Sequence, residues 1–134
     1  MGEYLERAKE LRAITDPHYN CAQSVVVPFA KKAGMDEADA MRFTANFGMG
    51  MKRGATCGSI VGGLMVLGLF GIDDPQTVSD FHKRFRDKHD GMLDCAQLLK
   101  ANSDKGLERK PHCDGMVYES VGYLEEILKE KGKI

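Results

Sequence analysis

The chain has 134 residues, 43% of them hydrophobic, which suits one domain that buries its own core. Its net charge of −1 argues against a general electrostatic attraction to nucleic acid or to an anionic membrane. Its most apolar stretch, residues 60–72, is too short to span a bilayer and reads as a buried helix. We therefore expect no nucleic-acid partner and no membrane insertion.

Helical periodicity runs through nearly all of the chain, and no segment alternates like a strand. A first helix is expected to end near Asp16 and a second to begin at Asn20. Pro28 is expected to kink the second helix or to end its first part. The later helices are expected at Asp36–Phe47, Cys57–Phe70, Asp74–Gly91, Asp94–Leu99 and Asp114–Lys131, with a loop at residues 101–111. The sequence thus predicts an all-α, compact bundle of about six helices in a single domain, residues 1–134.

Two groups of glycines stand out between these helices. Residues 48–54 form a glycine-rich connector that lacks the Gly-Lys-Ser/Thr ending of a phosphate loop. The connector is expected either to let the backbone pass close to a functional site or simply to form turns. Gly58 and Gly62 lie one helical turn apart, so a second backbone is expected to approach that face.

Four cysteines lie where helices are expected to begin: Cys21, Cys57, Cys95 and Cys113. Asn20-Cys-Ala-Gln and Asp94-Cys-Ala-Gln each place Gln three residues after a cap residue, as in a capping box. The partial positive charge of a helix N-terminus favours a thiolate over a thiol. We therefore expect a shared redox or metal site, although four buried small hydrophobic residues are the simpler alternative.

The cysteine spacing excludes several familiar sites. No two cysteines form CxxC, which is typical of zinc ribbons and thioredoxin-like sites, and no CxxCH is present to attach haem. The N-terminal residues are charged and lack the apolar core of a signal peptide, which favours a cytoplasmic location. Lasting disulfides are rare in that reducing compartment, so catalysis, metal binding or simple burial are the roles considered.

Other candidate side chains lie near the cysteines. His112 adjoins Cys113, and His18 precedes Cys21 by three residues, so either imidazole could be a ligand or an exposed bystander. His82 and His89 are expected to be surface groups. The methionines are expected to serve packing rather than copper binding.

The segment Cys57-Gly58-Ser59-Ile60-Val61-Gly62 resembles the signature of the C_GCAxxG_C_C family of redox-active proteins, with serine where alanine is usual. Cys21, Cys95 and Cys113 match the one preceding and two following cysteines of that family. The resemblance extends to the split-Soret cytochrome c group and implies a cluster site built from all four cysteines. It does not carry over the haem, because no attachment motif is present.

Three functions follow as hypotheses. The first is an electron-transfer protein in which Cys21, Cys57, Cys95 and Cys113 bind a metal centre, with an iron–sulfur cluster preferred. The second is a metal-free thiol–disulfide oxidoreductase or redox sensor, with Cys57 as an accessible nucleophile and Cys113 as its resolving partner. The third is a non-catalytic interaction domain held together by zinc on the four cysteines. A redox partner protein of unknown identity and a homodimer are further expectations.

Overall fold

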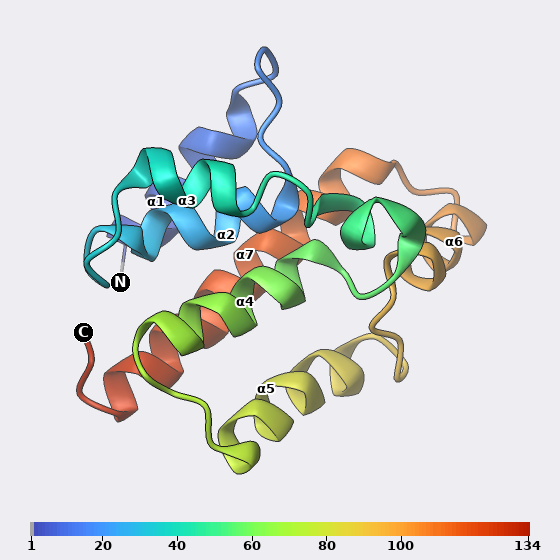
Figure 1. Ribbon diagram of the computed structural model, residues 1–134. Helices are drawn as coiled ribbons and strands as arrows, with labels where there is room; N and C mark the ends of the chain where they lie inside the picture. The colour runs from blue at the N-terminus through green and yellow to red at the C-terminus, as the bar shows by residue number, and fades with distance from the viewer. Residues whose placement is uncertain (1) are drawn as a thin grey trace.

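The computed structural model describes residues 2–134, and the regular elements of this part of the chain are all helices, without a strand. Seven α-helices and one short irregular helical segment, η1, follow one another along the chain (Figure 1). They are α1 (Glu3–Ala13), α2 (Cys21–Ala30), α3 (Glu37–Phe43), η1 (Gly50–Gly54), α4 (Gly58–Leu69), α5 (Pro75–Lys88), α6 (Cys95–Asp104) and α7 (Arg109–Glu130). The all-α prediction is confirmed, whereas the expected number of about six helices is too low.

The main difference from expectation lies between α6 and α7. Residues 101–111 were expected to form a loop, but α6 continues to Asp104 and α7 already begins at Arg109. The short connection is closed by Asn102, whose side-chain amide donates to the carbonyls of Leu107 and Glu108. Most of this stretch therefore belongs to two helix ends, and residues 105–108 alone form the connection.

Two expected helix ends also differ. Pro28 does not interrupt α2, which continues to Ala30. The third helix ends at Phe43 and not at Phe47. There the buried hydroxyl of Thr44 donates to the carbonyl of Ala40 at 2.6 Å, so the side chain binds the last turn of the helix.

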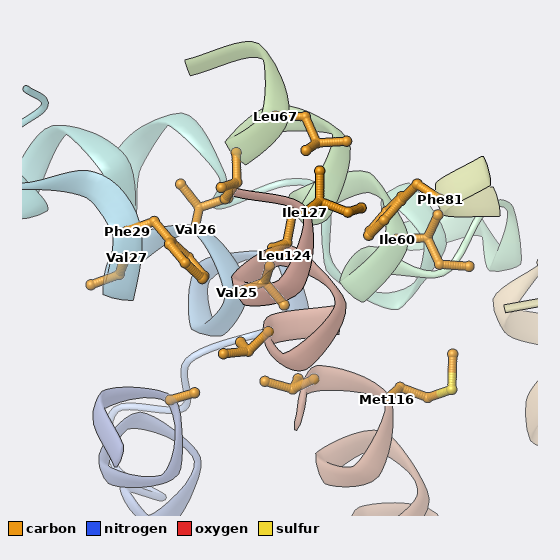
Figure 2. Packing of buried hydrophobic residues seen from close by; sticks show 14 of the residues in the cluster. Val25, Val26, Val27, Phe29, Ile60, Leu67, Phe81, Met116, Leu124 and Ile127 are labelled. Carbon is orange, nitrogen blue, oxygen red and sulfur yellow. The ribbon is translucent and has the colours of Figure 1, made fainter. Parts of the chain in front are cut away.

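The centre of the bundle is formed by α2, α4 and α7, which contact one another along their lengths. Figure 2 shows the apolar side chains that meet there from α2, α4, α5 and α7: Val25, Val26, Val27, Phe29, Ile60, Leu67, Phe81, Met116, Leu124 and Ile127. The expected close approach at Gly58 and Gly62 is confirmed. A Cβ on Gly62 would lie 3.1 Å from the carbonyl oxygen of Ala22, so glycine allows α4 to pack directly on the α2 backbone.

Two further helices cover this centre. In α1, Tyr4 stacks on Phe29 with ring centroids 4.4 Å apart. In α5, Phe81 and Phe85 are fully buried, and Phe85 makes an edge contact with Tyr123 of α7 at 5.1 Å. Both helices are therefore attached to the bundle by aromatic side chains.

The starts of α4, α6 and α7 and the segment η1 gather on one side of the molecule, at the right of Figure 1. We call this region, together with the start of α2, the thiol end of the bundle. It holds all four cysteines.

Candidate functional site

Three of the four cysteines lie at helix starts. Cys21 is the first residue of α2, Cys95 is the first of α6, and Cys57 is the N-cap of α4. Cys113 is not at a start, because α7 begins at Arg109 and Cys113 lies in its second turn. All four are free thiols. The N-terminal helix environment therefore applies to three of them, and Cys113 needs another source of activation.

The two Cys-Ala-Gln segments are built differently. At α2 the capping box is confirmed: the Gln23 backbone N–H donates to the Asn20 side chain at 2.8 Å, and the Asn20 N–H donates to the Gln23 side chain at 2.9 Å. At α6 the Asp94 side chain caps nothing, so a second capping box is absent there. Asp94 instead pairs with Thr56 in a single antiparallel bridge.

This bridge joins the starts of α4 and α6. The Cys57 N–H donates to the Leu93 carbonyl at 2.9 Å, and the Cys95 N–H donates to the Ala55 carbonyl at 2.6 Å. The backbones that carry Cys57 and Cys95 are therefore tied together by their own hydrogen bonds.

Glycines bring the remaining backbone close to Cys21 and Cys95. A Cβ on Gly58 would lie 2.9 Å from the Phe47 carbonyl oxygen and 3.2 Å from the Cys21 Cβ. In the connector, a Cβ on Gly54 would lie 3.0 Å from Ala96, the neighbour of Cys95. The expectation that these glycines let the chain pass close to the cysteines is thus met by direct contacts.

A small cavity of about 20 Å³ is lined by all four cysteines. Its remaining lining residues are Met49, Gly58, Leu98, Leu99, His112 and Met116. The four thiols therefore face one small common space.

The expected metal centre is not supported by this arrangement. Within residues 2–134, no three or more histidine, cysteine, aspartate or glutamate side chains are grouped so that they could hold a metal ion. The cysteines as placed therefore do not form the ligand set of an iron–sulfur cluster. What they do form is a close pair.

That pair consists of Cys21 and Cys113. Both side chains line the small cavity. The pKa of Cys113 is lowered to about 6: hydrogen bonding with the Cys21 thiol is the largest cause, Arg109 also lowers it, and burial opposes the shift. Hydrogen bonding with Cys113, followed by burial, raises the pKa of Cys21. The negative charge is therefore favoured on Cys113 and the proton on Cys21.

The other two cysteines are less reactive. Cys57 is only 6% exposed, and burial raises its pKa to about 11, although the backbone N–H groups of Ser59 and Ile60 offset part of the increase. The expectation that Cys57 is open to attack is therefore wrong. Burial also raises the pKa of Cys95, and the nearby Cys113 adds to the increase.

A second, larger cavity of about 450 Å³ shares Cys21, Met49 and Cys113 with the small one. Its lining combines the two thiols with basic side chains: Arg12, His18, Asn20, Cys21, Gly48, Met49, Lys52, Arg109, Lys110 and Cys113. Arg12 is almost fully buried; it binds Asp114 at 2.7 Å and the Tyr19 carbonyl at 2.9 Å. The pair therefore lines both a small sulfur-lined cavity and a large basic one.

The basic residues were missed at the sequence level. Arg109 precedes Cys113 by four positions, a spacing that places two side chains on one helix face. That signal was hidden because α7 was expected to begin at Asp114. His89, expected at the surface, is mostly buried, and it binds Glu119 at 3.0 Å.

The connector contributes an unusual backbone. Met49, Gly50, Met51 and Lys52 have φ values of 53°, 61°, 58° and 59°, which together make one left-handed turn. Residues other than glycine adopt this conformation at a cost of about 1–2 kcal/mol each. Met49 lines both cavities, so the strained turn forms part of the wall around the thiol pair.

None of the helices in residues 2–134 combines the length and the apolar character needed to cross a bilayer.

Comparison with known proteins places the chain in a family. No curated protein and no solved structure matches the chain. Residues 19–127 match the family described as "Putative redox-active protein (C_GCAxxG_C_C)". The relation to split-Soret cytochromes stays a prediction. Because the match covers most of the chain and includes all four cysteines, the protein belongs to the C_GCAxxG_C_C family.

Proposed function

We propose that the protein is a thiol–disulfide redox protein in which Cys21 and Cys113 interconvert between a dithiol and a disulfide. The observation that carries this proposal is that Cys21 and Cys113 line the same two cavities, with the charge favoured on Cys113. Cys57, expected to be the nucleophile, is the most buried of the four and is set aside from that role.

The geometry supports a specific order of events. The Cys113 thiolate attacks one sulfur of an oxidised partner's disulfide, and the partner's other sulfur leaves as a thiolate. Cys21 then attacks the Cys113 sulfur of this mixed disulfide. Its proton passes to the leaving thiolate, and the second partner thiol is released. Two electrons move from the protein dithiol to the partner disulfide, and the reverse sequence reduces the protein.

Peptide mapping after redox titration tests this assignment. The protein is equilibrated with mixtures of reduced and oxidised dithiothreitol, its free thiols are trapped, and its disulfides are identified by mass spectrometry. We expect a single two-electron transition that produces a Cys21–Cys113 disulfide. The transition should be lost in Cys113→Ser and retained in Cys95→Ser. An oxidised protein that pairs Cys57 with Cys95 instead would refute the assignment.

A metal centre is the competing function, and the four cysteines around one small cavity are the observation that favours it. It would require the sulfurs to move, because they do not surround a metal site as placed. Anaerobic purification followed by metal and sulfide analysis separates the cases. Stoichiometric iron with a visible absorption band would favour the cluster, and stoichiometric zinc without a band would favour a structural site. In either case Cys95→Ser should release the metal, whereas a dithiol pair is unaffected by this change.

A further inference from the structure

The large basic cavity has the size and position of a substrate site for the thiol pair. Its volume of about 450 Å³ lies within the range of about 300–1,000 Å³ that is usual for small-molecule sites. Cys21 and Cys113 both lie on its wall, so a molecule bound there is within reach of the sulfur that attacks. This inference rests on the proposed dithiol function.

The charged side chains that line this cavity are all basic. Arg12, Lys52, Arg109 and Lys110 line it, and none of its lining residues is acidic. Asp114, which is not part of the lining, binds Arg12 at 2.7 Å and Lys110 at 3.2 Å and neutralises part of this charge.

Two of the four cations remain without a carboxylate partner. Lys52 donates to the neutral amide oxygen of Asn46 at 2.8 Å, and Arg109 lies close enough to Cys113 to lower its pKa. The ion pairs found within residues 2–134 include neither of them. A positive charge that the protein itself does not neutralise next to a reactive sulfur favours an anionic ligand.

The surroundings of His18 agree with a positive field. Burial lowers the pKa of His18, and the charges of Arg12, Lys110 and Arg109 lower it further. The imidazole at the cavity wall therefore tends to stay neutral, so the anion-binding charge comes from the arginines and lysines.

We propose that this cavity binds a low-molecular-weight disulfide that carries carboxylate groups, and that this molecule is the oxidant of the Cys21–Cys113 pair. Lys52 and Arg109 bind its carboxylates, which places its sulfurs against Cys113. The Cys113 thiolate forms a mixed disulfide and displaces one carboxylate-bearing thiolate. Cys21 then displaces the second, so that one disulfide is reduced to two thiols while the protein dithiol becomes a disulfide.

Three small disulfides of similar length test the charge preference directly. The reduced protein is mixed with 3,3′-dithiodipropionate, 2-hydroxyethyl disulfide or cystamine, which are anionic, neutral and cationic. Rates of Cys21–Cys113 disulfide formation are each divided by the rate of N-acetylcysteine with the same disulfide, because leaving-group thiols differ in pKa. We expect the normalised rate to be about tenfold higher for the anionic than for the neutral probe, lowest for the cationic probe, and sensitive to salt.

Lys52→Gln is the sharpest variant, because it removes one positive charge from the cavity wall and keeps a side chain of similar size. It should remove most of the preference for the anionic probe over the neutral probe. Lys129→Gln is the matched control: it removes the same charge from an exposed position in the last turn of α7 and should keep the preference. Circular dichroism verifies that both variants fold.

The possible results separate the two levels of the proposal. Equal normalised rates for all three probes, with the Cys21–Cys113 disulfide formed each time, would overturn the anionic substrate and leave the dithiol function standing. A preference that survives in Lys52→Gln would overturn the assigned carboxylate contact. Absence of a Cys21–Cys113 disulfide with every probe would overturn the dithiol function itself.

Discussion

The two halves of α7 are used in opposite ways. Its second half presents Val121, Leu124 and Leu128 to the core, all of them fully buried. Its first half presents Arg109, Lys110 and Cys113 to the large cavity instead. One continuous helix therefore contributes burial energy to the core and reactive groups to the thiol end. Because the helix is continuous, the packing of its second half in the core also fixes the position of Cys113.

The backbone shows the same division. At the core, glycines such as Gly62 serve close packing between regular helices. At the thiol end, the chain passes through a left-handed turn at residues 49–52, which only a stable remainder of the fold can tolerate. The comparison teaches that the packed core stabilises the fold, and that this stability offsets the backbone strain, the cavities and the unpaired charge at the thiol end.

The largest effect is expected from the core. Leu124→Ala should lower the free energy of unfolding by about 2–5 kcal/mol, because the fully buried side chain leaves a cavity. Chemical denaturation measures this loss. At low denaturant the alkylation rate of Cys113 should stay unchanged, and a large change in that rate would show that the two regions are not separable.

Gly58→Ala tests the close approach that connects the two regions. The new methyl group meets the Phe47 carbonyl oxygen and the Cys21 Cβ, so we expect a loss of about 1–3 kcal/mol. The control is Gly122→Ala, within α7, where no atom lies within 4 Å of the added methyl group. That change should stabilise the protein by about 0.5–1 kcal/mol, since alanine favours helix more than glycine. Equal effects in thermal unfolding would contradict the packing assigned to Gly58.

The strained turn predicts a change of opposite sign. Met51→Gly should stabilise the protein by about 0.5–1 kcal/mol, because glycine adopts a positive φ without strain and the Met51 side chain is partly exposed. In α3, Ala38→Gly should cost a similar amount, because Ala38 is exposed in a regular helix. Urea denaturation of the two variants compares the signs. Destabilisation by Met51→Gly would argue against the left-handed turn.

The stability of the protein is also expected to depend on pH. The pKa of Cys113 is about 6 in the folded protein, against an ordinary value of 9.0. Between these two values the unfolded chain holds a proton that folded Cys113 has lost, so stability should rise with pH across this window. The contribution of the Cys113 thiolate to the free energy of unfolding is fully present above pH 9 and is lost as the pH falls through 6. Cys113→Ser should remove this slope.

Reactivity measures the same pKa directly. The rate of iodoacetamide modification at Cys113 should rise with a midpoint near pH 6. Cys21→Ala removes the donated hydrogen bond and should shift the midpoint upward, toward that of an ordinary thiol. Ser120→Ala provides a control, because Ser120 donates to the Ser59 carbonyl and not to a thiol. A midpoint that does not move in Cys21→Ala would contradict the role of Cys21 in lowering the pKa of Cys113.

Much of the fold was predictable because it depends on neighbours along the chain. The capping box at Asn20, the proline start of α5 at Asp74-Pro75 and the glycine face of α4 all follow from residues within one or two turns. The start of α7 was not predictable, because the polar residues around Arg109 and Pro111 are typical of a loop. With the helix expected to begin at Asp114, Cys113 fell outside it, and the four-residue spacing from Arg109 to Cys113 carried no meaning.

The sequence by itself determined the helical class, the close packing at Gly58 and Gly62, and the family through its four cysteines. Only the tertiary structure decided which sulfurs meet, because Cys21 and Cys113 belong to helices from opposite ends of the chain. It also decided that Cys57 is buried and that basic side chains surround the pair. Caps and helical faces are local properties, whereas sulfur contacts, burial and pKa depend on how distant helices pack.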